Sequence, residues 1–228
     1  MKPTLILLHG ALGSQDQFSV LFNLLKADFE LHSFNFSGHG GQPAEQDFSM
    51  KNFITDCLDF MNEQAISSSH FFGYSMGGYV ALTLALHHPE RVHKIITLGT
   101  KFNWSPAAAE KEIRMLDPEK IEVKLPTFSV ELQKRHGPEN WKEVLQKTAK
   151  MMLDLGNGKA LSVVDLQNIQ NEVFICLGSK DQMVSKDETE RAAKNLPQGR
   201  FKELPDVEHR MEKVNMDQLA LVIKKFLC

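Results

Sequence analysis

Residues 73–78 read Gly73-Tyr74-Ser75-Met76-Gly77-Gly78, and this stretch decides the fold. It follows a short apolar run at His70–Tyr74, which is typical of a buried strand, and it precedes a helical pattern over Met76–Leu86. A serine between a strand and a helix sits on a sharp turn, where only small neighbours let the two elements approach. The pattern predicts an exposed, reactive Ser75 hydroxyl at the carboxyl edge of a sheet. It also fits a serine that only caps a helix after a glycine turn.

On both sides of this stretch, β-branched or leucine-rich runs alternate with helical patterns, which is typical of a parallel sheet covered on both faces. The alternation stops over residues 101–170, where the chain reads as mostly helical. We expect an α/β fold in which residues 1–100 and 171–228 form a mostly parallel sheet of about six strands flanked by helices, with a helical cap inserted at 101–170. The expected strands are Thr4–Leu8, Phe29–Phe36, His70–Tyr74, Lys94–Leu98, Val173–Leu177 and Arg200–Leu204.

The composition is that of an ordinary globular domain, with 42% hydrophobic and 24% charged residues. A net charge of −3 gives no electrostatic reason to expect nucleic acid or an anionic membrane as partner. The sequence has no secretion signal and no run that reaches the roughly 18 apolar residues of a membrane span. Its three cysteines are scattered, without the spacing of a zinc site. We expect a cytoplasmic protein without metal or cofactor, and the oligomeric state stays open.

A serine hydroxyl becomes a good nucleophile when a base takes its proton and an acid orients that base. Asp181 follows the strand at Val173–Leu177, and His209 follows the strand at Arg200–Leu204. Both side chains are therefore expected at the same sheet edge as Ser75. The sequence predicts Ser75 as nucleophile, His209 as base and Asp181 as the orienting acid.

The competing side chains are worse placed. Asp187 and Glu188 are the main rivals to Asp181, but acids in the first turn of a helix are explained by the helix dipole. His70 lies at the opposite end of the sheet, and His136 lies in the insertion. His9 is expected to hold the loop after the first strand by hydrogen bonds.

The tetrahedral oxyanion of an acyl transfer needs two hydrogen-bond donors. The amide that follows the nucleophile, on Met76, is the first expected donor. The second is expected from the loop after the first strand, with Ala11 as the first choice and Leu12 as the second.

Five stretches together resemble the α/β-hydrolase superfamily, in its small branch of cap-bearing esterases and related enzymes. They are LILLHGALGS (5–14), FNFSGHGGQP (34–43), GYSMGGYVAL (73–82), GSKDQMVS (178–185) and DVEHRMEKV (206–214). The resemblance implies that the insertion is a helical cap over the active site. The chain begins at the strand before the first of these stretches, so six parallel strands are expected in place of eight. Lyases of this branch that share the Gly-His-Gly-Gly turn have an arginine where this chain has Tyr79, which weakens the case for a polyanionic substrate.

Aromatic side chains near the nucleophile suggest the nature of the pocket. Tyr74, Phe102 and Trp104 are candidate substrate-binding residues, although Phe102 and Trp104 can equally well pin the insertion to the core. An apolar pocket with few charges favours a small-molecule ester or acyl substrate. We expect a serine hydrolase that cleaves short acyl esters through an acyl-enzyme. The alternatives are a lyase, thioesterase or acyl transferase that uses the same triad, or a non-catalytic binding module on this fold.

Overall fold

The apolar runs of the sequence form the six strands of one parallel sheet, in the order β2-β1-β3-β4-β5-β6. The computed structural model of the chain describes residues 2–227. The strands are β1 (Thr4–Leu8), β2 (Glu30–Ser33), β3 (Ser69–Tyr74), β4 (Val92–Leu98), β5 (Glu172–Gly178) and β6 (Gly199–Leu204). The expected parallel sheet of about six strands is confirmed. Strand β2 is shorter than Phe29–Phe36, because beyond Ser33 the amide of Phe36 donates to the His9 ring and not to a neighbouring strand.

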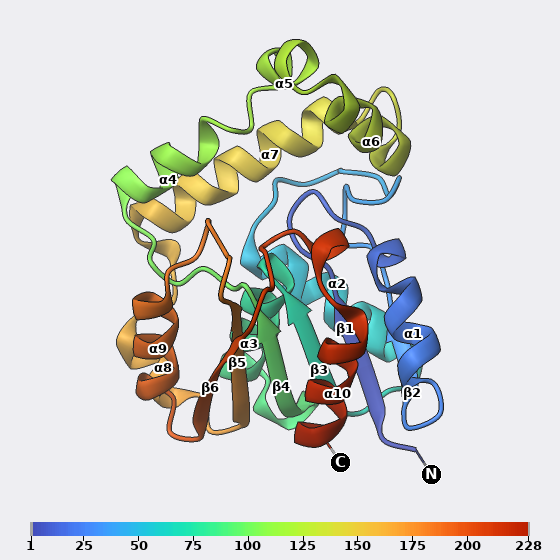
Figure 1. The fold of residues 1–228 in the computed structure, drawn as a ribbon, viewed down its shortest axis with the longest axis vertical. Helices are drawn as coiled ribbons and strands as arrows, with labels where there is room; N and C mark the ends of the chain where they lie inside the picture. The colour runs from blue at the N-terminus through green and yellow to red at the C-terminus, as the bar shows by residue number, and fades with distance from the viewer. Residues whose placement is uncertain (1, 228) are drawn as a thin grey trace.

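Helices cover both faces of the sheet (Figure 1). One core cluster packs helices α2, α3, α8 and α9 against one face, and a second packs α1 and α10 against the other. Alternate residues of one strand serve the two clusters, as Leu5 and Ile6 of β1 do, because successive strand side chains point to opposite faces. The helices of these layers are α1 (Ser19–Leu25), α2 (Met50–Glu63), α3 (Met76–His87), α8 (Val163–Asn168), α9 (Lys186–Asn195) and α10 (Met216–Leu227), with short helical turns η1 (Gln15–Phe18), η2 (Pro89–Arg91) and η4 (Met211–Lys213).

The chain between β4 and β5 is helical and, apart from α8, lies across one end of the sheet (Figure 1). We call this segment, residues 99–171, the helical insertion. It has a small core of its own, which contains Ile121, Leu132, Trp141 and Leu145. Besides α8, its helices are α4 (Pro106–Ile113), α5 (Pro118–Lys124), α6 (Pro126–His136), α7 (Trp141–Asp154) and η3 (Leu155–Lys159).

The order of the strands locates the edge where a ligand site is expected. From β1, the chain crosses to β2 on one side and continues through β3 on the other. The loops that follow β1 and β3 therefore diverge, and such a switch point leaves a crevice at the carboxyl ends of the strands. Ser75 follows β3 and Ala11 follows β1, so both lie at this crevice.

Two further observations concern membrane spans and cysteines. Within residues 2–227, no helix is both long enough and apolar enough to span a bilayer. Cys57 and Cys176 are free and buried, and Cys228 lies outside the described residues.

The approach of α3 to β1 can be tested with Gly77→Ala. A Cβ on Gly77 would lie 2.1 Å from the Leu8 carbonyl oxygen, which is backbone and cannot rotate away. We expect a loss of about 1–3 kcal/mol in the free energy of unfolding, measured by urea denaturation. An alanine in place of a helical glycine ordinarily stabilises by up to about 1 kcal/mol, so an unchanged or increased stability would contradict the expected collision. Gly158→Ala places a Cβ where no atom lies within 4 Å, but at a φ of +98°, so it measures the cost of backbone strain without a collision.

Candidate active site

Ser75 sits on a strained turn between β3 and α3. Its φ of 51° and ψ of −114° lie in a region that residues with a side chain rarely adopt. The conformation is held by the Ser75 amide, which donates to the Leu98 carbonyl at 2.8 Å, and by Thr100 Oγ1, which donates to the Ser75 carbonyl at 3.0 Å. The turn also needs glycines, since a Cβ on Gly73 would lie 2.3 Å from the Gly78 Cα. The Ser75 side chain is left partly exposed at the carboxyl edge of the sheet.

Asp181 and His209 meet across the neighbouring loops. The Asp181 carboxylate oxygen Oδ2 lies 2.7 Å from Nδ1 of His209, while Oδ1 accepts hydrogen bonds from the amides of Met183 and Val184 at 2.8 and 2.9 Å. The Asp181 side chain is only 1% exposed, so its charge is balanced by these donors and not by water. Because the carboxylate accepts the hydrogen on Nδ1, the neutral His209 ring carries a free lone pair on Nε2.

Gly99 brings this pair to the neighbourhood of Ser75. It follows Leu98, the strand residue that holds the Ser75 amide, and it has a φ of +66°. A Cβ at Gly99 would lie 3.2 Å from the His209 ring and 3.3 Å from Asp181 Oδ2, so the strand end packs directly against the pair. Within residues 2–227 the Ser75 hydroxyl forms no hydrogen bond.

The Tyr74 side chain has a positioning role. Its hydroxyl donates to the His209 carbonyl at 2.8 Å, and its ring centroid lies 5.7 Å from that of His209. Burial raises the pKa of Tyr74, so the hydroxyl stays a donor. The strand that carries Ser75 therefore also anchors the loop that carries His209.

Two residues with unpaired main-chain amides line the same cavity. Met76 is the first residue of α3 and Ala11 lies in the loop after β1, and both line the cavity at Ser75. Neither amide donates to a protein group within the described part of the chain. Leu12, the second choice of the sequence analysis, has a φ of 58° and does not line that cavity. The arrangement can stabilise an oxyanion through Ala11 and Met76.

A small, largely apolar cavity of about 50 Å³ opens at Ser75. The helical insertion supplies part of its wall, and Lys101 is the one charged side chain among the described residues that line it. The lining residues are Ala11, Met50, Ser75, Met76, Tyr79, Lys101, Trp104, Met151, Met152 and Leu155. Trp104 thus lies where the sequence analysis expected it. Phe102 and Tyr74 do not line this cavity, and Phe102 packs instead against the core cluster of α2 and α3.

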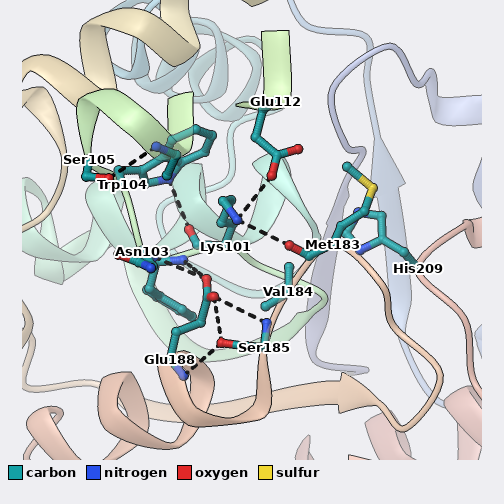
Figure 2. A network of polar contacts seen from close by, with 12 residues as sticks. Lys101, Asn103, Trp104, Ser105, Glu112, Met183, Val184, Ser185, Glu188 and His209 are labelled. Carbon is teal, nitrogen blue, oxygen red and sulfur yellow. Dashed lines mark hydrogen bonds and ion pairs between the residues drawn. The ribbon is translucent and has the colours of Figure 1, made fainter. Parts of the chain in front are cut away.

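The start of the insertion is tied to the loop that carries Asp181 (Figure 2). Glu188 Oε1 accepts the amides of Phe102 and Asn103 at 3.0 and 3.1 Å, and its other oxygen accepts from Ser185. Burial opposes ionisation of Glu188, but the hydrogen bonds outweigh it, so the pKa of this carboxyl lies below its usual value. Glu188, a rival to Asp181 in the sequence, is therefore a structural acid.

His136 ties the end of α6 to two core loops. Its Nδ1 accepts the Gly40 amide at 3.1 Å and its Nε2 donates to the Leu12 carbonyl at 3.0 Å, while Arg135 donates to the same carbonyl at 2.7 Å. His9 holds the loop after β1, as expected, by a hydrogen bond from its Nδ1 to the Gly10 carbonyl at 2.8 Å. The insertion thus helps to shape the loop that contains Ala11.

Sequence reasoning missed Lys101, His136, Met50 and Leu155 as residues of this region. Lys101 had a usable signal, because it lies three residues after the end of β4, at the carboxyl edge of the sheet. The other three come from helices or helix ends whose docking the sequence does not encode locally. Within residues 2–227, no group of three or more His, Cys, Asp or Glu side chains gathers to hold a metal.

Comparison with known proteins places the chain in a class. The family model described as alpha/beta hydrolase fold matches residues 3–121, which is more than half of the chain. The chain belongs to this family.

The relatives and solved structures agree with that family. The chain is 30% identical over 109 residues to a putative carbamate hydrolase RutD of Pseudomonas syringae pv. syringae (strain B728a), which covers 47% of this chain and 42% of that protein. It is 32% identical over 97 residues to a pimeloyl-[acyl-carrier protein] methyl ester esterase of Hamiltonella defensa, which covers 42% and 36%. The chain therefore spans less than half the length of these curated relatives. The crystal structure of the enol-lactonase from Burkholderia xenovorans LB400 has a TM-score of 0.79 at 18% identity, covering 100% of this chain and 92% of that one, and supports the fold alone.

The neutral state of His136 predicts how acid acts on the protein. Burial lowers the pKa of His136 to about 4, although the hydrogen bond to Leu12 opposes the shift, and burial likewise lowers the pKa of His9 to about 4. The unfolded chain takes up these protons near pH 6.5 and the folded chain does not, so stability is full above pH 6.5 and falls as the pH drops toward 4.

Urea denaturation between pH 7 and 4.5 measures this loss. We expect His136→Gln, whose amide can still accept from Gly40 and donate to Leu12, to reduce the slope of unfolding free energy against pH by up to about 1.4 kcal/mol per unit. The same substitution at the surface residue His88 is the control. An unchanged slope in His136→Gln would show that the buried histidine is not its source.

Proposed function

We propose that this protein is a serine hydrolase that cleaves carboxylic esters of short acyl groups through an acyl-enzyme. The observation that carries the proposal is the 2.7 Å contact between Asp181 and His209, beside a strained and partly exposed Ser75. The names of relatives, which include a hydrolase and a methyl ester esterase, agree with ester cleavage.

In the proposed reaction, Nε2 of His209 takes the proton of the Ser75 hydroxyl as Oγ attacks the ester carbonyl. The negative charge that develops on the carbonyl oxygen is stabilised by the amides of Met76 and Ala11. The imidazolium is stabilised by Asp181 and then protonates the departing alcohol oxygen. A water molecule, deprotonated by His209, attacks the acyl-serine and releases the carboxylic acid and the free Ser75.

We further propose that the helical insertion, residues 101–170 in the sequence analysis, acts as a cap. Four cavity residues support this, because Trp104, Met151, Met152 and Leu155 approach Ser75 from the insertion. The contacts of His136 and Arg135 with the Leu12 carbonyl join the cap to the proposed oxyanion loop. Closure by an apolar wall excludes water, which strengthens the electrostatic contacts inside the site.

The triad is tested by kinetics and covalent labelling. We expect Ser75→Ala and His209→Ala each to lower kcat on p-nitrophenyl acetate by at least about a thousandfold while the protein stays folded, and Ser75→Ala to abolish labelling by a fluorophosphonate. Asp181→Asn should lower kcat strongly, whereas Asp187→Asn, at an exposed position of the first turn of α9, is the matched control. A loss below about tenfold for Ser75 or His209 would contradict the assigned roles.

The size of the cavity predicts a preference among acyl chains. A volume of about 50 Å³ holds only a few heavy atoms, but Met50, Met151 and Leu155 separate it from a neighbouring cavity of about 590 Å³ whose lining they share. Among p-nitrophenyl esters, we expect kcat/KM to be highest from the acetate to the butyrate and to fall about tenfold or more at the octanoate. The extra methylenes of octanoate need space that the cavity lacks.

Met151→Ala should join the two cavities and raise the octanoate to butyrate ratio of kcat/KM about tenfold. Met152 lines the cavity at Ser75 but not the neighbouring cavity, so Met152→Ala is the matched control. It should leave the octanoate to butyrate ratio of kcat/KM low. Measuring a ratio of two substrates on one sample cancels any loss of folded protein. Equal ratios in the two variants would show that Met151 does not limit the chain length.

A further inference from the structure

Lys101 brings a cation into an otherwise uncharged cavity. It lies three residues beyond the last residue of β4, it lines the cavity at Ser75, and its side chain is 18% exposed. The other described residues around the cavity are apolar apart from the hydroxyls of Ser75 and Tyr79. An ammonium in such a place loses much of its hydration, so its remaining interactions decide what binds beside it.

Three partners hold the ammonium in place (Figure 2). Nζ lies 3.2 Å from the carboxylate of Glu112 in α4, and it donates to the Met183 carbonyl at 3.2 Å. It also lies 5.9 Å from the centre of the Trp104 ring. Glu112 is itself buried, with a side chain 8% exposed, so the charge of Lys101 is neutralised at close range.

The ammonium has a donor to spare. It carries three N–H groups, and the contacts with Glu112 and Met183 engage two of them at most. No other acceptor meets Nζ within residues 2–227. The third N–H is therefore free to donate to a substrate oxygen in the cavity.

The position of Met183 indicates which part of a substrate Lys101 meets. The amide of Met183 donates to Asp181, which orients His209, and the carbonyl of Met183 accepts from Lys101. Lys101 is therefore fixed to the loop that serves the base. In the proposed reaction the base protonates the departing oxygen, so we place the alcohol part of the ester beside Lys101. The acyl chain then points toward Met50, Met151 and Leu155, which line the same cavity.

We propose that Lys101 is a specificity-determining residue that donates a hydrogen bond to an uncharged oxygen in the alcohol part of the ester. An ether, carbonyl or hydroxyl oxygen fits. The Glu112 carboxylate, 3.2 Å from Nζ, already neutralises the ammonium and repels a second anion bound beside it. The inference rests on the proposed ester-cleaving function. It assigns a substrate class, acetyl-sized esters of oxygen-bearing alcohols.

The test compares esters that differ in a single group. In 2-methoxyethyl acetate an ether oxygen replaces one methylene of butyl acetate, and 3-acetoxypropanoate carries a carboxylate at a similar place. We expect kcat/KM for 2-methoxyethyl acetate to exceed that for butyl acetate by roughly tenfold, as expected for one hydrogen bond from a charged donor. Each ratio of ether to alkyl ester is divided by the ratio of the same two esters in hydroxide-catalysed hydrolysis, because the ether oxygen also raises intrinsic reactivity. In Lys101→Met this corrected ratio should fall to nearly one.

Two further variants separate recognition from structure. Glu112→Gln keeps the ammonium but removes the neutralising charge, so it should raise kcat/KM for 3-acetoxypropanoate relative to 2-methoxyethyl acetate by about tenfold. The double variant Lys101→Met with Glu112→Gln avoids an unpaired buried carboxylate and should behave as Lys101→Met does. All readouts are ratios on one sample, so partial unfolding does not move them.

The outcomes are distinct. An ether preference that survives in Lys101→Met overturns the inference, and so does an ether preference confined to the acyl side, measured with methyl methoxyacetate against methyl butanoate. A failure of Glu112→Gln to favour the anionic ester overturns the role given to Glu112. If the protein hydrolyses butyl acetate without any ether preference, only this inference fails, whereas no hydrolysis of any ester by the unaltered protein refutes the proposed function itself.

Discussion

The close approach of three backbone segments around Ser75 is the constraint on which the rest of the structure depends. The strand β3, the first turn of α3 and the end of β1 come so near that a single added methyl at Gly73 or Gly77 would overlap backbone atoms. This crowding holds Ser75 at a positive φ, a conformation that costs free energy and persists only where its surroundings enforce it. The hydroxyl is thereby lifted to the edge of the sheet, and the amide of Met76 is left free beside it.

The parallel sheet then brings the remaining groups to that edge. All six strands run in one direction, so each loop that follows a strand lies on the same side of the molecule. Asp181 follows β5, His209 follows β6, and Ala11 follows β1. The precise contact between Asp181 and His209 comes from the loops themselves, through two amides that fix the carboxylate and a tyrosine hydroxyl that fixes the His209 backbone.

The helical insertion is bound to the core by polar contacts at two places, near its start and near its middle. Near its start, Glu188 and Lys101 join it to the loop of Asp181, and at the end of α6, His136 and Arg135 join it to the loop of Ala11. Each of these groups is buried or half-buried, where a missing partner is costly. The insertion and the sheet edge therefore share one set of interactions, and a change in the insertion is felt at Ser75.

Local sequence determined the elements and the order in which they occur. The runs of apolar residues placed five of the six strands within two residues of their ends, and the glycine-flanked serine identified the turn, because both depend on chemistry confined to a few neighbouring residues. The same holds for Asp181, His209, Ala11 and Met76, which stand beside strand ends in the chain. Tertiary structure alone decided the contents of the cavity, the partners of Lys101 and His136, and the buried place of Tyr74. The contacts of Tyr74 with His209, of His136 with the core and of Lys101 with Met183 join residues 82 to 135 positions apart. The docking of whole helices on the sheet sets them, and no local pattern encodes it.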